Sequence, residues 1–270
     1  MKKKLIISFS CVGAAVILIV ILLFTLFGLG SVTLDIRTYG SIFASEEKQA
    51  EVVESGEFRY NTPVFFQNKR NYINNLERKN PYLKVVGIEI KFPRSMVVKC
   101  VDREETFAIK ISDNKYFIVD EDMKFLRMTE EFSSEQTNAI LLGGEFTVLN
   151  TDASPGEFLS LSAGQALIEN FSPCMKVNNR SVAEQKALFK SLNLKFRINP
   201  LTAKSQAYLE LEDFAGLKMS IMEADDDLTL KINCLLASWA SVSPADYQNH
   251  ELKALKNSKG EIFCILTEKS

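Results

Sequence analysis

Two short motifs in this sequence contain the residue types that penicillin-recognising enzymes use for nucleophilic chemistry. Ser45-Glu46-Glu47-Lys48 matches SxxK, and Ser112-Asp113-Asn114 matches SDN. Such an enzyme needs the serine, the lysine and a third motif, KTG, in one cleft, and this sequence contains no KTG. Asp and Asn are also favoured in turns, and Ser112-Asp113-Asn114 falls between two alternating segments. The sequence therefore predicts no enzyme, and a covalent adduct with a fluorescent penicillin would contradict that prediction.

Cysteine and histidine could also carry nucleophilic or metal chemistry, but their pattern does not suggest it. The sequence has no CxxC, no Cys/His cluster, and a single histidine, His250, which we expect near a surface turn. GxSxG, HExxH and phosphate-cradling glycine loops are absent as well, so we expect no cofactor, no metal and no small-molecule substrate. The four cysteines beyond residue 29 could pair in three ways. Most lie among apolar residues, which favours buried free thiols over disulfides, and both states stay open: Cys100, Cys174, Cys234 and Cys264.

Residues 5–29 indicate where in the cell the protein is located. The run follows three lysines, contains no charged or amide side chain, and has 17 Val, Ile, Leu or Phe residues. About 20 apolar residues suffice to cross roughly 30 Å of hydrocarbon. The small residues at Gly28-Leu29-Gly30 suggest a cleaved signal peptide instead, but the apolar part of a signal is usually only about 7–15 residues long. We expect a cytoplasmic tail at 1–4, one transmembrane helix at 5–29, and extracytoplasmic domains beyond it, because lysines stay on the cytoplasmic side.

The part beyond residue 29 is mildly acidic. It carries all 34 Asp and Glu, against 29 of the 32 Lys and Arg. Nucleic-acid binding needs a clustered basic face, so this balance argues against it and favours protein partners. About 240 residues suffice for two domains with cores of their own.

Residues 31–102 have a pattern of strand, helix, helix, strand and strand. We expect a strand at 32–39, a helix with Ser45 as N-cap that ends at Gly56, and a second helix over 63–79. Alternation then predicts strands at 86–92 and 96–101. The second helix should present Phe66, Tyr72, Ile73 and Leu76 on one face, and the expected core contains Leu76, Ile88, Ile90 and Val98.

Residues 103–270 are predicted to be rich in strands, which makes the whole chain an α+β protein. Helices are expected at 164–171, 182–192 and 228–240, packed on one face of an antiparallel sheet. The expected strands are 106–111, 116–120, 124–127, 146–150, 206–211 and 218–223, followed by a closing hairpin with strands 251–256 and 261–267 around the turn 257–260.

Several of these segments together form a recognisable pattern. Asn80-Pro81-Tyr82 precedes an alternating strand, and a second such strand follows Phe92-Pro93-Arg94-Ser95 and leads to Val101-Asp102-Arg103-Glu104. A hairpin segment at 116–122 and a lysine-bearing helix start at 226–231 come later. With the apolar run, this pattern resembles the bacterial cell-division family FtsQ/DivIB. One departure is Leu252-Lys253-Ala254-Leu255, where the family usually has an arginine-bearing sequence.

The resemblance implies a POTRA domain at 31–102 and a β domain at 103–270. It also implies a non-enzymatic, single-pass membrane scaffold of the divisome at the septum, which binds partners of the FtsL and FtsB/DivIC types and coordinates septal wall synthesis. A membrane-anchored envelope scaffold unrelated to division shares every physical feature derived from the residues.

The final strand is the expected partner site. Ile262-Phe263-Cys264-Ile265-Leu266 is five apolar residues in succession. At a sheet edge, the unpaired N–H and C=O groups of such a strand would form a template for a partner strand. A central strand buried on both faces is the alternative explanation. Because the family presents its carboxyl-terminal region to a division partner, the resemblance favours binding, with these candidate residues: Glu261, Ile262, Phe263, Ile265 and Leu266.

Overall fold

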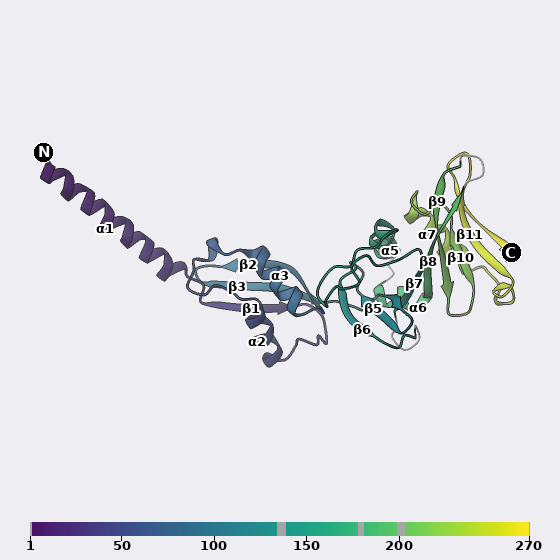
Figure 1. Cartoon of the computed structure of the whole chain (residues 1–270), viewed down its shortest axis with the longest axis horizontal. Helices are drawn as coiled ribbons and strands as arrows, with labels where there is room; N and C mark the ends of the chain where they lie inside the picture. The colour runs from purple at the N-terminus through teal and green to yellow at the C-terminus, as the bar shows by residue number, and fades with distance from the viewer. Residues whose placement is uncertain (1, 134–138, 178–180, 199–202, 270) are drawn as a thin grey trace. The chain divides into compact units, whose positions relative to one another are not determined.

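The computed structural model describes the backbone of residues 2–133, 139–177, 181–198 and 203–269, and their side chains except at 2–12 and 177. The chain divides into two compact units, Met1–Arg103 and Glu104–Ser270. Both units combine helices with a sheet, so the chain is a mixed α+β protein (Figure 1).

The first unit begins with helix α1, Lys2–Phe27. The helix stops before the expected residue 29, because the chain turns into the sheet domain at Gly28 and Leu29. The Leu29 N–H donates to the Thr62 carbonyl and the Leu29 carbonyl accepts from the Asn61 N–H, both at 2.9 Å. The Leu29 side chain is fully buried in the core of this unit. Within the described part of the chain, no helix combines the length and the apolar character of a membrane span.

The rest of the first unit has the expected order of strand, helix, helix, strand and strand. The three-stranded sheet has the order β1-β3-β2, with β1 parallel and β2 antiparallel to β3. Ser45 caps α2 as expected, since its side chain accepts from the Lys48 N–H. The elements are β1 (Ser31–Ile36), α2 (Glu46–Ser55), the 3-10 helix η1 (Val64–Phe66), α3 (Lys69–Lys79), β2 (Leu83–Lys91) and β3 (Ser95–Asp102).

The helix expected over 63–79 is interrupted. Gln67 is extended, and Asn68 starts α3 as a new N-cap by accepting from the Asn71 N–H at 3.2 Å. The Gln67 side-chain amide donates to two backbone carbonyls, which holds the chain in this extended turn. Phe66, expected on the buried face, is therefore 66% exposed.

The core of the first unit agrees with the expectation at two of four positions. Leu76 and Val98 are fully buried, whereas Ile88 and Ile90 are partly buried at its margin. A buried ion pair lies beside this core: the Arg103 Nη2 is 3.0 Å from Glu77 Oε2, and Glu77 Oε1 accepts from the Val85 N–H at 2.9 Å. This pair joins α3 to the start of β2 and the end of β3.

The second unit contains a nine-stranded sheet with the order β12-β11-β10-β9-β8-β7-β4-β5-β6. The expectation of an antiparallel sheet was wrong, because β4 with β7, β7 with β8, and β10 with β11 are parallel pairs. Parallel neighbours need long connections, and described helices lie between β7 and β8 and between β10 and β11. The strands are β4 (Phe107–Ser112), β5 (Lys115–Val119), β6 (Phe125–Thr129), β7 (Ile140–Gly144), β8 (Phe189–Ile198), β9 (Ser205–Asp213), β10 (Lys218–Ile221), β11 (His250–Lys256) and β12 (Ile262–Glu268).

Two further expectations in this unit were wrong, and one strand was not predicted. Residues 146–150 form no strand: Val148 makes only an isolated bridge with Leu161, and Phe146 is buried in the core. The sequence pattern missed β7 altogether. The helix expected at 182–192 ends at Leu188, because the chain continues directly into β8, which pairs with both β7 and β9.

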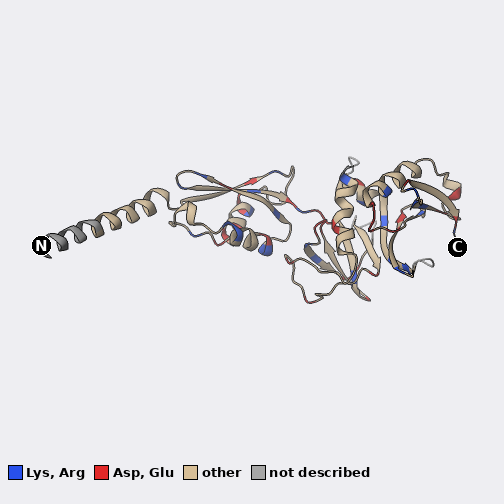
Figure 2. Ribbon diagram, turned by 90° about the horizontal axis from the view of Figure 1, so that it is seen from above, with Lys and Arg blue, Asp and Glu red and all other residues tan. Residues whose placement is uncertain are grey.

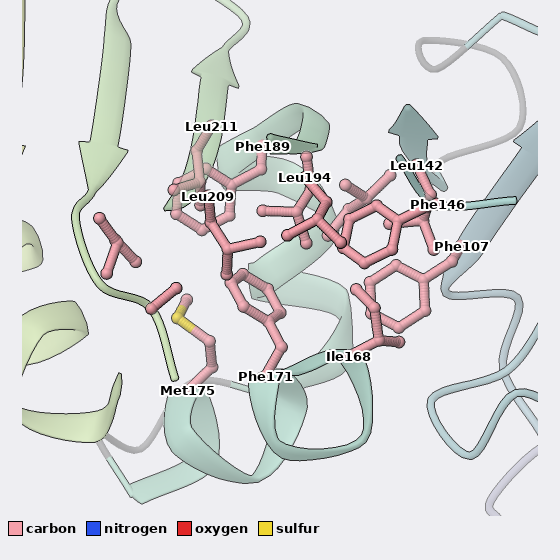
Figure 3. Packing of buried hydrophobic residues seen from close by; sticks show 14 of the residues in the cluster. Phe107, Leu142, Phe146, Ile168, Phe171, Met175, Phe189, Leu194, Leu209 and Leu211 are labelled. Carbon is pink, nitrogen blue, oxygen red and sulfur yellow. The ribbon is translucent and has the colours of Figure 1, made fainter. Parts of the chain in front are cut away.

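The helices of the second unit pack on a single hydrophobic core. On α5 (Gln165–Val177), the side chains of Ile168, Phe171 and Met175 point towards the sheet residues (Figure 3). Ile232 and Leu235 of α7 (Leu228–Trp239) belong to the same buried cluster. The spacing of these residues at one helical face explains why each helix lies flat against the sheet. In the described part of the unit, the other helical pieces are α6 (Val182–Leu188) and the 3-10 helix η2 (Pro244–Asp246).

Candidate partner-binding edge

The closing hairpin of β11 and β12 is confirmed, and its turn is held by local side-chain hydrogen bonds. Asn257 Oδ1 accepts from the N–H groups of Lys259 and Glu261, both at 2.9 Å, and Asn257 Nδ2 donates to Glu261 Oε2 at 2.7 Å. Gly260 has a φ of 83°, which favours glycine. Glu261 therefore closes the turn and precedes the strand.

Strand β12 lies at one edge of the described sheet, with β11 as its neighbour. The alternative of a central strand was wrong. The Asn257 N–H donates to the Glu261 carbonyl, and the Lys269 N–H donates to the Asn249 carbonyl, so odd-numbered residues bond to β11 at both ends of the hairpin. Since this pattern alternates along an antiparallel pair, the N–H and C=O groups of the even-numbered residues face the free edge: Ile262, Cys264, Leu266 and Glu268.

The candidate side chains divide between the two faces of β12. Phe263 and Ile265 are each 39% exposed and lie opposite Leu255 and Lys253, on the face away from the helices. Leu266, opposite the buried Leu252, is on the helix face and is also 39% exposed. Ile262 is partly buried. The structure thus brings four of the five predicted residues into one edge strand, with Glu261 at its start.

The sequence reasoning missed a charged concavity next to this edge. It has a volume of about 460 Å³, and β8, β9, β10 and β11 supply most of its lining. Two of its lysines are paired: Lys195 Nζ lies 2.8 Å from Glu210 Oε2, and Lys253 Nζ lies 3.0 Å from Glu251 Oε2. The hydrogen bond to Glu210 raises the pKa of Lys195. Its charged residues are five cations and two carboxylates: Lys195, Arg197, Lys218, Lys253, Lys269, Glu210 and Glu251.

This concavity carries a net positive charge although the chain as a whole is slightly acidic. Figure 2 marks Lys and Arg positions in blue on the ribbon, and several lie along the strands of the second unit. In 206–212 and 251–253, polar or charged residues alternate with apolar ones, a pattern that indicates strands with one exposed face. The sequence pattern could not show that the faces of four strands join into one surface.

Comparison with known proteins found no matching family model. The cell division protein DivIB of Clostridium botulinum is 24% identical over 178 residues, which cover 65% of this chain and 67% of that protein. The cell division protein DivIB of Clostridium acetobutylicum is 28% identical over 97 residues, which cover 36% of this chain and 37% of that protein. The similarity to these two DivIB proteins supports the resemblance of the chain to the FtsQ/DivIB family.

The residues that carried the resemblance to this family have structural contacts. Asp120 is buried, and its Oδ1 accepts from the N–H groups of Asp122 and Lys124, which forms the turn before β6. Lys231 is fully buried, donates to the Glu223 carbonyl at 2.8 Å, and has a pKa lowered by burial. Arg103 makes the buried ion pair of the first unit. These residues therefore stabilise the fold.

The two enzyme-like motifs also have local roles. The Ser45 side chain caps α2, and Lys48 Nζ lies 2.9 Å from Glu51 Oε2 on the same helix. Ser112 ends β4, and the turn that follows it leads to β5. Neither motif needs a catalytic function to explain its residues.

Proposed function

We propose that this chain is a non-enzymatic, membrane-anchored scaffold of the bacterial cell-division machinery, which binds another division protein by strand addition at β12. The names of the two DivIB relatives support the role in division. The observation that carries the binding mode is the free edge of β12, flanked by the exposed side chains of Phe263 and Ile265. The occupant would be a segment of an FtsL- or FtsB/DivIC-type protein.

Membrane anchoring is supported by the surface of α1. The described large apolar side chains from Val16 to Leu26 are mostly 46–62% exposed, on all sides of the helix. The proposal of a membrane span rests on the sequence, because the apolar run 5–29 exceeds the about 20 residues that cross roughly 30 Å of hydrocarbon. With Lys2, Lys3 and Lys4 on the cytoplasmic side, both sheet-containing units would be extracytoplasmic.

This placement predicts a simple experiment. Protease added to intact spheroplasts should digest epitopes beyond residue 31 and should spare a tag at the amino terminus. Deletion of residues 2–27 should release the protein from the membrane fraction. Protection of both ends, or no release on deletion, would contradict the proposed topology.

The proposed domain assignment follows from the two units. The β1-α2-α3-β2-β3 order supports a POTRA domain at 31–102, and the large mixed sheet supports the β domain at 103–270. The SxxK and SDN motifs are explained by a cap and a turn, which supports a function without catalysis.

In strand addition at β12, one set of residues would supply the backbone hydrogen bonds and another set would supply the side-chain contacts. The partner backbone would bond to the even-numbered residues 262–268, and partner side chains would contact Phe263 and Ile265. The positive concavity beside Ile265 suits a partner with acidic side chains flanking the added strand. Binding of this kind would let the protein hold a division partner in position while the septal wall is synthesised.

A proline substitution tests the edge without breaking the hairpin. Leu266→Pro removes an N–H that faces the free edge and leaves the hydrogen bonds to β11 in place. With the full chain in nanodiscs and an FtsB/DivIC-type partner, Kd should rise roughly tenfold or more, as expected for at least one lost backbone hydrogen bond. Leu266→Ala controls for the lost side chain. Unchanged affinity in a variant whose circular dichroism matches the wild type would refute strand addition.

A fluorescent fusion tests the division role separately. We expect recruitment to midcell in dividing cells. A uniform distribution around the envelope would favour the alternative, an anchored envelope scaffold unrelated to division.

A further inference from the structure

Two cysteine thiols of the second unit lie next to each other. Cys234 is in the middle of α7 and Cys264 is in the middle of β12, 30 residues later in the chain. Their Sγ atoms are 2.7 Å apart, against about 2.05 Å in a disulfide bond. Both side chains are partly exposed, so a reagent can reach them. The two sulfur atoms therefore need only a small approach to bond.

The other described cysteines lie in different surroundings. Cys100 is buried in the first unit, where its Sγ is 3.7 Å from the Val98 carbonyl oxygen. Cys174 is buried on α5, where its Sγ lies 3.0 Å from Thr229 Oγ1. Each of these two sulfur atoms faces an oxygen, whereas the sulfur atoms of Cys234 and Cys264 face each other, so the geometry selects Cys234 and Cys264 as the pair.

We propose that Cys234 and Cys264 form an intramolecular disulfide that fastens the edge strand β12 to helix α7. Each thiol loses one hydrogen, an S–S bond forms, and two electrons and two protons pass to an oxidant. The oxidant is a disulfide, either of a thiol–disulfide oxidoreductase or of oxidised glutathione, and it is reduced to two thiols. In the cell this step relies on the extracytoplasmic placement proposed above, where disulfides persist.

The disulfide would anchor β12, which pairs with the described sheet only through β11. Cys264 is opposite Ala254 of β11, and its side chain packs on the core beside α7. Its N–H and C=O groups, in contrast, face the free edge. A bond to Cys234 would thus secure β12 from its helix face and leave the edge groups open for a partner strand.

The surroundings of Cys264 also affect how the bond forms. Burial, together with the hydrogen bond to Cys234, raises the pKa of the Cys264 thiol to about 12. Because the thiolate is the attacking species, a thiol with so high a pKa is slow to start exchange at neutral pH. Oxidation would therefore begin at Cys234 or after a local opening of β12, and an oxidoreductase would accelerate it.

The test compares the purified full chain in reduced and oxidised glutathione buffers. After alkylation and digestion, mass spectrometry should show one cross-link between the peptides containing Cys234 and Cys264, with a loss of two hydrogens. Closing a loop of this length should raise the melting temperature of the second unit on the order of 10 °C. Hydrogen exchange of residues 262–268 should slow on oxidation.

Matched variants separate this bond from a general effect of oxidation. Cys234→Ser and Cys264→Ser should each abolish the thermal shift, and Cys174→Ser should keep it. Complete alkylation of both Cys234 and Cys264 in the oxidised, folded wild type would overturn the proposal, and this readout needs no variant. A cross-link between any other pair would overturn it as well. Because no partner is present, a failure here is distinct from a failure of strand addition.

Discussion

The buried ion pair of Glu77 and Arg103 should be a large contributor to the stability of the first unit. Glu77 is 8% exposed and Arg103 is 7% exposed, and the carboxylate accepts from both the guanidinium and the Val85 N–H. Glu77→Gln keeps the shape of the side chain and removes the carboxylate charge that faces the buried Arg103 guanidinium. Breaking a buried pair in this way typically costs about 3–5 kcal/mol. That loss is comparable with the total stability of many small domains, about 5–15 kcal/mol.

Hydrogen exchange of the full chain in increasing urea is the suitable assay. The single tryptophan, Trp239, is in the second unit, so its fluorescence does not report on the first unit. Peptides from α3, β2 and β3 should lose protection at lower urea in Glu77→Gln. Glu57→Gln is the matched control, because the Glu57–Lys79 pair is solvent-exposed and its loss should change the stability little. Equal stabilities of the two variants would refute the reasoning.

Three further outcomes follow from burial and charge. Leu76→Ala should lower the free energy of unfolding of the first unit by about 2–5 kcal/mol in urea. Ile88→Ala should lower it clearly less, because Leu76 is fully buried and Ile88 is only partly buried. The reverse order would contradict the described core. Burial raises the pKa of Cys100 from 9.0 to about 12, so the folded state keeps a proton that the unfolded state releases. The resulting stability is complete below pH 9 and is lost as the pH rises towards 12, and Cys100→Ala should flatten that decline in alkaline unfolding curves. Charge reversal at Arg197 and Lys253 should slow partner association and weaken its dependence on ionic strength in stopped-flow measurements, whereas an unchanged rate would exclude the concavity from recognition.

The elements that the sequence predicted well are those whose signal is local. Alternation gave β2, β3 and the closing hairpin to within a few residues, and the capping serine located the start of α2. Local signals failed where the same short segment is compatible with a second conformation, or where its pattern is not typical of the element that it forms. Asn68 offered a cap inside an otherwise continuous helical pattern. The segment Ile140-Leu141-Leu142 has no alternation because apolar side chains pack against both faces of β7, with Ile140 and Leu142 in one cluster and Leu141 against another.

The candidate site was predictable only in part, for a similar reason. The apolar run 262–266 predicted the strand β12 but left an edge strand and a central strand both open, and the family resemblance favoured the edge. The concavity needed knowledge of strand order, since Lys195 and Lys253 are far apart in sequence and come together only because β10 joins β9 to β11. Likewise, the proximity of Cys234 to Cys264 depends on how α7 lies against β12.

The alternation of β12 affects how substitutions in this strand would be read in a genetic screen. The groups offered to a partner strand belong to the main chain of residues 262, 264, 266 and 268, which every amino acid except proline supplies in the same form. If β12 binds a partner by strand addition, a screen of single replacements would find most changes at these positions tolerated even though the strand is needed. Under the same proposal, related chains could diverge at these positions and still bind the same partner, because main-chain groups would form the hydrogen bonds.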